Sequence, residues 1–126
     1  MPFTLTKEFK FEAAHVLLGH DGKCARLHGH SWVGEVVLEG DKLVQDGPKA
    51  GMLADFGDVS AALEPLVDDY LDHHFLNETL ATDRPTSEFV AEWVYNRLRG
   101  KLPGLSAVVI RETCTSSCRY GTRGGA

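Results

Sequence analysis

Two stretches near the start of the chain alternate between apolar and polar residues with a period of two. Residues 3–15 carry an apolar, aromatic or histidine side chain at every second position except Lys7, and residues 28–39 repeat the alternation. Such a period places successive side chains on opposite faces of a β-strand. The segment between them contains Gly19 and Gly22, which favour turns. The pattern therefore predicts two long strands joined by a loop.

The middle of the chain changes to the period of a helix. Apolar residues of segment 58–71 recur at intervals of three and four, and Asp58 stands where an N-cap is expected. Pro65 has no backbone N–H, so it predicts a kink or a break in this helix. A second helical pattern covers residues 86–99, with Thr86 at its start.

The last clear element is a strand over residues 106–114. Its inward face is expected to carry four alternating residues: Val108, Ile110, Glu112 and Cys114. The tail 120–126 is rich in glycine, so it is expected to be mobile.

The order of elements is two strands, two helices, and then one or two strands, without an internal repeat or linker. This order predicts an α+β fold in which an antiparallel sheet carries both helices on one face. The helices leave the other face of the sheet uncovered. We therefore expect the chain to associate with copies of itself.

Composition restricts the class of protein. The 126 residues fit a single domain, 1–126, and 43% hydrophobic and 25% charged residues exclude a disordered chain. A net charge of −5 argues against non-specific binding to nucleic acid or to an anionic membrane. The sequence shows no membrane span or secretory signal, so a cytoplasmic protein is expected. Three cysteines fit a reducing compartment, and the spacing of Cys114 and Cys118 matches no common metal or redox motif.

Three histidines are candidate metal ligands. His28 and His30 lie two apart on a predicted strand, so they share a face with Cα atoms about 6.5–7 Å apart. His15 ends the preceding strand, which can bring it alongside. Three imidazoles without a local fourth ligand suit a catalytic zinc ion with an open position. The alternative is that they are surface histidines or hydrogen-bonded core histidines. However, the predicted strand face that carries His28 and His30 also carries Trp32, and burying an unpaired imidazole on such an apolar face costs free energy.

Cys24 is the candidate reactive thiol. It precedes His28 by four residues, so it is expected near the metal, where a cation would favour the thiolate that serves as base or nucleophile. The alternative is a small buried side chain. Lys23 and Arg26 flank it in the loop, which argues for an accessible position.

Two carboxylates also draw attention. Asp72 precedes His73 at the end of the first predicted helix, where it could orient the imidazole, although His73 could instead only stabilise the helix terminus. Glu112 shares the predicted inward face with Ile110, so its carboxylate needs a donor, such as a ligand with a guanidine-like edge. The alternative is the opposite register, in which Glu112 is exposed and Arg111 is buried.

Five sequence motifs follow one another over almost the whole chain: FEAAH ending at His15, CARLHGH at 24–30, LDHHFLN at 71–77, PTSE at 85–88 and ETCTSSC at 112–118. Together, and in this order, they resemble the 6-pyruvoyltetrahydropterin synthase family. The arrangement of Cys24 before the HGH sequence is most similar to the bacterial 6-carboxytetrahydropterin synthase branch.

The resemblance implies an architecture. Members have the tunnelling fold, in which a four-stranded antiparallel sheet carries two helices. Their subunits join edge to edge into trimeric barrels, and two trimers stack into a hexamer. A homohexamer is therefore expected for this chain.

The resemblance also implies an activity. The substrate would be 7,8-dihydroneopterin triphosphate, and the products 6-carboxy-5,6,7,8-tetrahydropterin, acetaldehyde and triphosphate, in queuosine biosynthesis. In this reaction Cys24 matches the base, Asp72 and His73 the pair that assists it, and Glu112 the residue that anchors the pterin. Three residues match the zinc ligands: His15, His28 and His30.

Charge and loop position, without support from the family, make Lys23 and Arg26 candidates for binding the triphosphate. Three other functions remain open at this stage. They are a pyruvoyl-forming synthase that only eliminates triphosphate, a zinc hydrolase, and a non-catalytic assembly protein stabilised by zinc.

Overall fold

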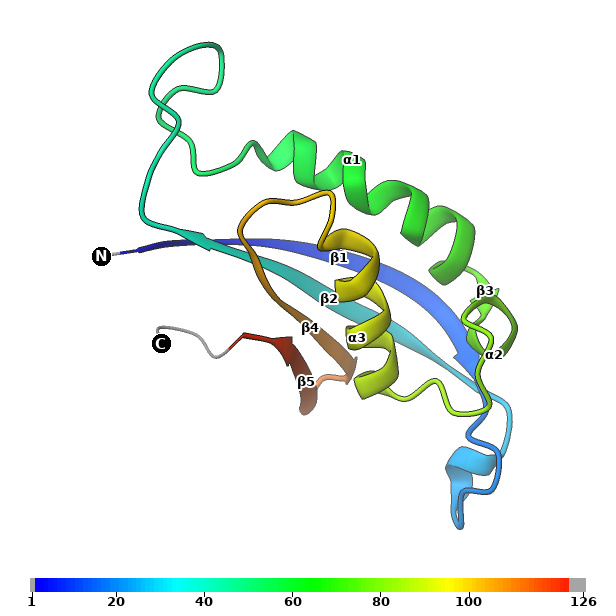
Figure 1. The fold of residues 1–126 in the computed structure, drawn as a ribbon. Helices are drawn as coiled ribbons and strands as arrows, with labels where there is room; N and C mark the ends of the chain where they lie inside the picture. Colours follow the sequence, from blue (N-terminus) through cyan, green and yellow to red (C-terminus); the bar gives the residue numbers. More distant parts are fainter. Residues whose placement is uncertain (1, 123–126) are drawn as a thin grey trace.

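The computed structural model describes residues 2–122, and a single twisted sheet organises them (Figure 1). Its strands lie in the order β3-β1-β2-β4-β5. The five strands are β1 (Phe3–His15), β2 (His28–Gly40), β3 (His74–Phe75), β4 (Leu105–Thr113) and β5 (Ser116–Gly121). The two long strands at the start of the chain are those predicted from the alternating pattern.

Strands β1 and β2 form a long antiparallel pair whose ends are matched. The register runs from Phe3 opposite Gly40 to His15 opposite His28. Strand β4 pairs antiparallel with β2, and β5 pairs antiparallel with β4. The matched register places all three candidate histidines at one end of the sheet.

The expected four-stranded, wholly antiparallel sheet needs correction. A fifth strand, β3, pairs parallel with β1 through Ala13 and Ala14. Helix α1 (Phe56–Leu66) returns along the sheet in the direction of β1, so the chain reaches this edge parallel to β1 (Figure 1). The two residues of β3 are too few for an alternating pattern to reveal.

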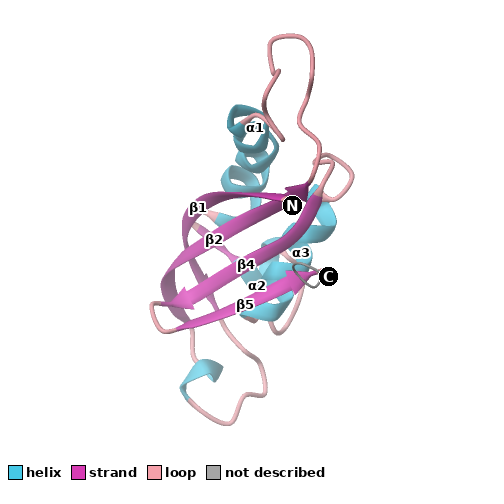
Figure 2. Cartoon of the chain, turned by 90° about the vertical axis from the view of Figure 1, so that its left-hand side faces the viewer, coloured by secondary structure: helices cyan, strands magenta, loops and turns pink. Residues whose placement is uncertain are grey.

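Both main helices lie on one face of the sheet, as predicted, and the other face is left uncovered by helices (Figure 2). Helices α1 and α3 (Ser87–Leu98) bury Leu63 and Val94 against the sheet. Phe11 and Trp32 stack at the centre of this core with ring centroids 5.5 Å apart. The core therefore packs against β1 and β2, the two strands that carry the three histidines.

The start of the first helix differs from the prediction. Asp55, not Asp58, is the N-cap, and its side chain accepts a hydrogen bond of 2.7 Å from the Gly57 N–H. Asp58 instead lies in the first turn and accepts a hydrogen bond of 2.7 Å from Lys49. The helix begins earlier because the cap needs an extended residue before the first turn, and Asp55 has that conformation.

Pro65 lies inside the first helix, which does not break at this residue, so the prediction of a break there is wrong. The α-helix ends at Leu66, and a π-helical turn, η2 (Val67–Leu71), follows directly. In this turn the Asp72 N–H donates to the Val67 carbonyl at 2.7 Å. The short helix α2 (Leu76–Thr79) after β3 was not predicted.

Two details at the C-terminal end also correct the sequence reading. Cys114 is exposed in the turn between β4 and β5 and does not face inward, because the strand ends at Thr113. Residues 120 and 121 belong to β5, so the predicted mobile tail is wrong for them. The Thr122 N–H donates to the Ser106 carbonyl at 2.7 Å, and residues 123–126 of that tail lie outside the described residues.

Across residues 2–122, no helix has the length and apolar character needed to span a membrane.

Candidate metal centre

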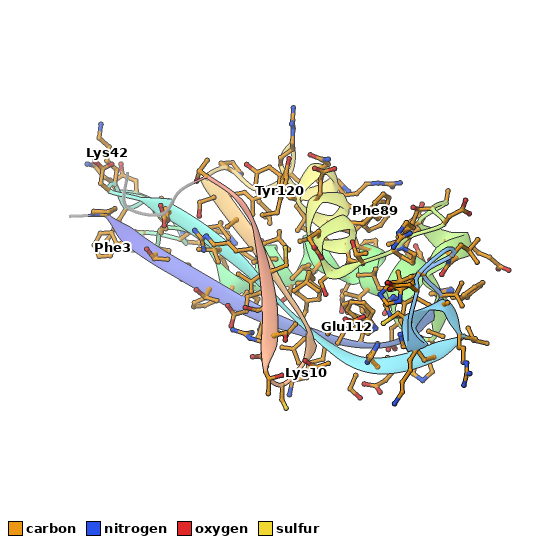
Figure 3. The ribbon with its side chains drawn as sticks, turned by 90° about the horizontal axis from the view of Figure 1, so that it is seen from below. Phe3, Lys10, Lys42, Phe89, Glu112 and Tyr120 are labelled. Atoms are coloured by element: carbon orange, nitrogen blue, oxygen red, sulfur yellow. The ribbon has the colours of Figure 1, made fainter. Side chains whose placement is uncertain are left out.

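Three histidines and one glutamate converge where β1 ends and β2 begins. The register places His15 opposite His28, and His30 opposite Ala13. Glu112 reaches the group from β4, and one potential ligand atom of each of the four residues lies within 4.8 Å of the others. Figure 3 shows Glu112 far from Phe3 and Lys42, which lie at the other end of the sheet. The structure thus brings together the three predicted metal ligands and the predicted inward-facing carboxylate.

Backbone carbonyls fix the orientation of two of the histidine rings. His15 Nδ1 lies 2.8 Å from the Pro85 carbonyl oxygen, and His28 Nδ1 lies 2.6 Å from the Arg26 carbonyl oxygen. A carbonyl only accepts hydrogen bonds, so each Nδ1 is the protonated donor. In the neutral ring, Nε2 then carries a lone pair, as a metal ligand requires.

Glu112 approaches the histidines without a satisfactory hydrogen bond. Its Oε1 lies 2.9 Å from His15 Nε2 and 3.3 Å from His30 Nε2. Within the described residues, neither of these buried Nε2 atoms has a hydrogen-bond partner. The distances are short enough, but the angles at the nitrogen atoms are unsuitable for a hydrogen bond. With His15 Nδ1 protonated, an imidazole lone pair faces a carboxylate oxygen. In the neutral ring that arrangement is repulsive, and either a proton on Nε2 or a metal cation between the two atoms would relieve it.

The donor set fits a divalent metal ion. Three imidazole nitrogens and one carboxylate oxygen are ligands that zinc accepts in four-coordinate sites. His15 is completely buried, and a buried imidazole needs a partner for its second nitrogen. A metal at this position would supply the partner that Nε2 of His15 and Nε2 of His30 lack.

The protonation states favour metal binding. Burial lowers the pKa of His30, and His15 and His28 lower it further, against the opposite effect of Glu112. The contact with His15 lowers the pKa of Glu112, against the partial burial that raises it. His30 is therefore favoured as a neutral imidazole and Glu112 as a carboxylate, which are the forms that bind metal.

The loop between β1 and β2 carries the predicted thiol. Cys24 lies in a 3-10 turn, η1 (Lys23–Ala25), and its side chain is partly exposed. The Cys24 carbonyl accepts a hydrogen bond of 2.8 Å from the Leu17 N–H, which ties the loop to the end of β1. Lys23 and Arg26 are exposed beside it, as the sequence indicated. The Arg26 carbonyl also holds the His28 ring.

Asp72 and His73 form a contact pair at the β3 edge of the sheet. Asp72 Oδ2 lies 2.9 Å from His73 Nδ1, and Asp72 Oδ1 accepts a hydrogen bond of 2.8 Å from the Glu12 N–H. The His73 N–H donates to the Glu12 carbonyl at 2.6 Å and holds His73 at a φ of 60°, an uncommon conformation for a residue with a side chain. The His73 side chain is 79% exposed.

Two cavities flank the centre. One, of about 520 Å³, is lined by His30, Ser31, His73 and neighbouring residues, and Cys24 is not among them. The other, of about 350 Å³, is lined in part by Glu112. Hydroxyl, thiol and carboxylate groups line this second cavity: Ser87, Glu88, Glu112, Ser116, Ser117 and Cys118. Glu112 is therefore shared between the histidine group and a polar cavity.

Two supporting residues were not found from the sequence. Pro85 holds the His15 ring through its carbonyl from 70 residues away. Asn77 accepts from the Val16 N–H at 2.9 Å and donates to the Val16 carbonyl at 2.8 Å, which fixes the chain just after His15. Both contacts depend on tertiary structure, and no local pattern signals them.

A family model for 6-pyruvoyl tetrahydropterin synthase matches residues 4–123. The chain belongs to this family. The five motifs quoted above lie within the matched region, so the resemblance seen in the sequence is confirmed.

Similar proteins agree with membership of the 6-pyruvoyl tetrahydropterin synthase family. The chain is 50% identical over 115 residues to 6-carboxy-5,6,7,8-tetrahydropterin synthase of Synechocystis, covering 90% of this chain and 89% of that protein. It is 36% identical to the protein of the same name from Haemophilus influenzae, covering 94% and 98%. Among solved structures, 6-pyruvoyl tetrahydropterin synthase of Caenorhabditis elegans superposes with a TM-score of 0.81 at 28% identity, covering 98% and 97%.

Proposed function

We propose that this chain is a zinc-dependent 6-carboxy-5,6,7,8-tetrahydropterin synthase. As such, it is a lyase that converts 7,8-dihydroneopterin triphosphate and one water molecule into 6-carboxy-5,6,7,8-tetrahydropterin, acetaldehyde and triphosphate in queuosine biosynthesis. The observation that carries the proposal is the convergence of His15, His28, His30 and Glu112 in a chain of this family. The 50% identity to the Synechocystis synthase supports this branch over the pyruvoyl-forming branch.

Zinc would be held by the Nε2 atoms of three histidines: His15, His28 and His30. When bound, it supplies Lewis acidity that polarises an oxygen of the substrate side chain. The carbonyls of Pro85 and Arg26 hold two of the rings with Nε2 toward the centre, so little reorganisation is needed on binding.

Proton transfer is assigned to Cys24 and to the Asp72–His73 pair. The Cys24 thiolate removes a proton from a side-chain carbon next to a polarised oxygen, and its place in the exposed loop gives access to substrate. Asp72 contacts His73 Nδ1, which directs Nε2 outward and stabilises the ring when it accepts a proton. The 79% exposure of His73 leaves Nε2 free to exchange protons.

Substrate recognition is assigned to both ends of the site. The two oxygens of Glu112 accept hydrogen bonds from the 2-amino group and ring N–H of the pterin, for which the adjoining polar cavity offers space. Lys23 and Arg26 are exposed cations in the neighbouring loop, and they are the candidates for the triphosphate.

Product analysis tests the proposed reaction. The protein is incubated with 7,8-dihydroneopterin triphosphate, and acetaldehyde is measured by coupling to an alcohol dehydrogenase and NADH. One acetaldehyde per carboxylated pterin is expected. Triphosphate release with a dicarbonyl pterin and no acetaldehyde would assign the pyruvoyl-forming reaction, and phosphate-ester cleavage alone would assign a hydrolase.

A homohexamer built from two trimeric barrels is proposed as the assembly. In the described chain, β1 pairs with β3 only at Ala13 and Ala14, which leaves residues 3–11 of β1 with a free edge, and β5 forms the opposite edge of the sheet. Free edges favour pairing between copies. Light scattering coupled to size-exclusion chromatography tests the assembly, with six chains expected and a monomer contradicting it.

A further inference from the structure

The carboxylate of Glu112 contacts the histidine group and also lines a polar cavity. On one side, Oε1 contacts Nε2 of His15 and of His30 at 2.9 and 3.3 Å. On the other side, the same side chain lines the polar cavity of about 350 Å³. We propose that Glu112 is the fourth metal ligand in the substrate-free protein and leaves the metal for this cavity when the pterin binds.

Geometry and charge support the ligand role in the free protein. One ligand atom from each of Glu112, His15, His28 and His30 lies within 4.8 Å of the others, so one ion can contact all four. Three neutral imidazoles would leave two positive charges on the centre, and a carboxylate reduces them to one. A metal cation that joins the two atoms makes the contact between Glu112 and the neutral His15 ring favourable.

The pterin role requires the same oxygens. The amino-pyrimidinone edge presents two parallel N–H donors, and a carboxylate matches them with both of its oxygens. An oxygen that ligates a metal has less electron density to offer a hydrogen bond. A carboxylate free of the metal is the stronger acceptor at both oxygens, so pterin binding favours release of the metal by Glu112. This part rests on the proposed function for the identity of the ligand.

Exchange of Glu112 would couple recognition to reactivity. The fourth position stays closed by Glu112 until a pterin takes that carboxylate, and it then opens for the side chain of the same substrate.

Cobalt(II) absorption tests the ligand role without turnover. Metal-free protein is titrated with Co²⁺, whose visible spectrum depends on the number and type of ligands. Glu112→Gln should change the spectrum and weaken Co²⁺ binding by at least about 10-fold, the lower end of the loss for an outer-shell partner. Glu88→Gln is the matched control because Glu88 lines the same cavity but is outside the four-residue group. Circular dichroism verifies that both variants are folded.

The exchange itself is tested with 6-methylpterin, which has no side-chain hydroxyl to bind the metal. Its addition should shift the spectrum of the wild-type and Glu88→Gln proteins toward that of Glu112→Gln, and should leave Glu112→Gln unchanged. Equal spectra and affinities for Glu112→Gln and wild type would overturn the ligand role. A wild-type spectrum that does not respond to saturating 6-methylpterin would overturn the exchange.

Product analysis separates this inference from the proposed function. Acetaldehyde formation with no effect of Glu112→Gln on the cobalt spectrum would retain the reaction and reject the exchange. The expected spectral changes without acetaldehyde would retain the exchange and reject the reaction.

Discussion

His15 and Pro85 are 70 residues apart in the sequence, yet the Pro85 carbonyl accepts a 2.8 Å hydrogen bond from His15 Nδ1. Pro85 immediately precedes Thr86, the N-cap of α3, whose side chain accepts a hydrogen bond of 3.1 Å from the Phe89 N–H. The start of α3 is thus fixed by its own cap and in turn orients the buried histidine. Packing of α3 on the sheet and the geometry of the metal centre depend on each other.

The first prediction concerns the metal content. The wild-type chain should contain about one zinc ion, and His30→Ala should lose most of it because only two of the three imidazoles remain. His20→Ala is the control. His20 lies in the loop between β1 and β2, but it contacts Asp21 and Gly22 and is not part of the histidine group. Elemental analysis after dialysis measures both. Unchanged zinc in His30→Ala would remove His30 from the site.

The second prediction concerns the base. Cys24→Ala should retain its fold and metal but lose at least about 100-fold in turnover, the usual scale for deletion of a positioned proton-transfer group. Cys114→Ala, which changes an exposed cysteine in the β4–β5 turn, should keep the wild-type rate. Steady-state acetaldehyde production compares the two. A Cys24→Ala variant as active as Cys114→Ala would rule out Cys24 as the base.

The third prediction is a pH dependence of stability that arises from Asp72. The hydrogen bond from the Glu12 N–H, followed by the contact with His73, lowers the pKa of Asp72. A lowered pKa in the folded state stabilises the protein above the pKa of the unfolded state, about 3.9, and this stabilisation is lost as the pH falls through the folded-state pKa.

Asp72→Asn should therefore be less stable than wild type at neutral pH, and the difference should shrink as the pH falls below 4. Urea denaturation at a series of pH values measures it. Asp69→Asn is a suitable control, because Asp69 lies in the π-helical turn and the structure shows no side-chain bond to it in the described region. A difference for Asp72→Asn that is independent of pH would contradict the role of its charge.

The fourth prediction concerns packing between β1 and β2. Gly34 lies opposite Phe9, and a Cβ added at Gly34 would overlap the Phe9 ring. Gly34→Ala should reduce the free energy of unfolding by about 1–3 kcal/mol through overpacking. Gly100→Ala has open space around the added Cβ, so it should change stability by no more than about 0.5 kcal/mol. Equal denaturation midpoints for the two variants would show that Phe9 moves aside at no cost.

Sequence alone determined the elements with a strong local pattern. The alternation of 3–15 and 28–39 predicted the β1–β2 pair, and Thr86 marked the start of α3, because period and capping are local properties. The spacing of His28 and His30 was sufficient to place both on one face of a strand. The five motifs identified the family.

Only the tertiary structure decided the surroundings of the site. The parallel strand β3 and the supports from Pro85 and Asn77 arise from contacts between distant segments. Glu112 is the clearest case. Strand alternation could place its side chain on the inward face, but only the pairing of β4 with β2 brings that carboxylate to His15 and His30. Local pattern determines which way a side chain faces, whereas the packing of the whole chain determines what it meets there.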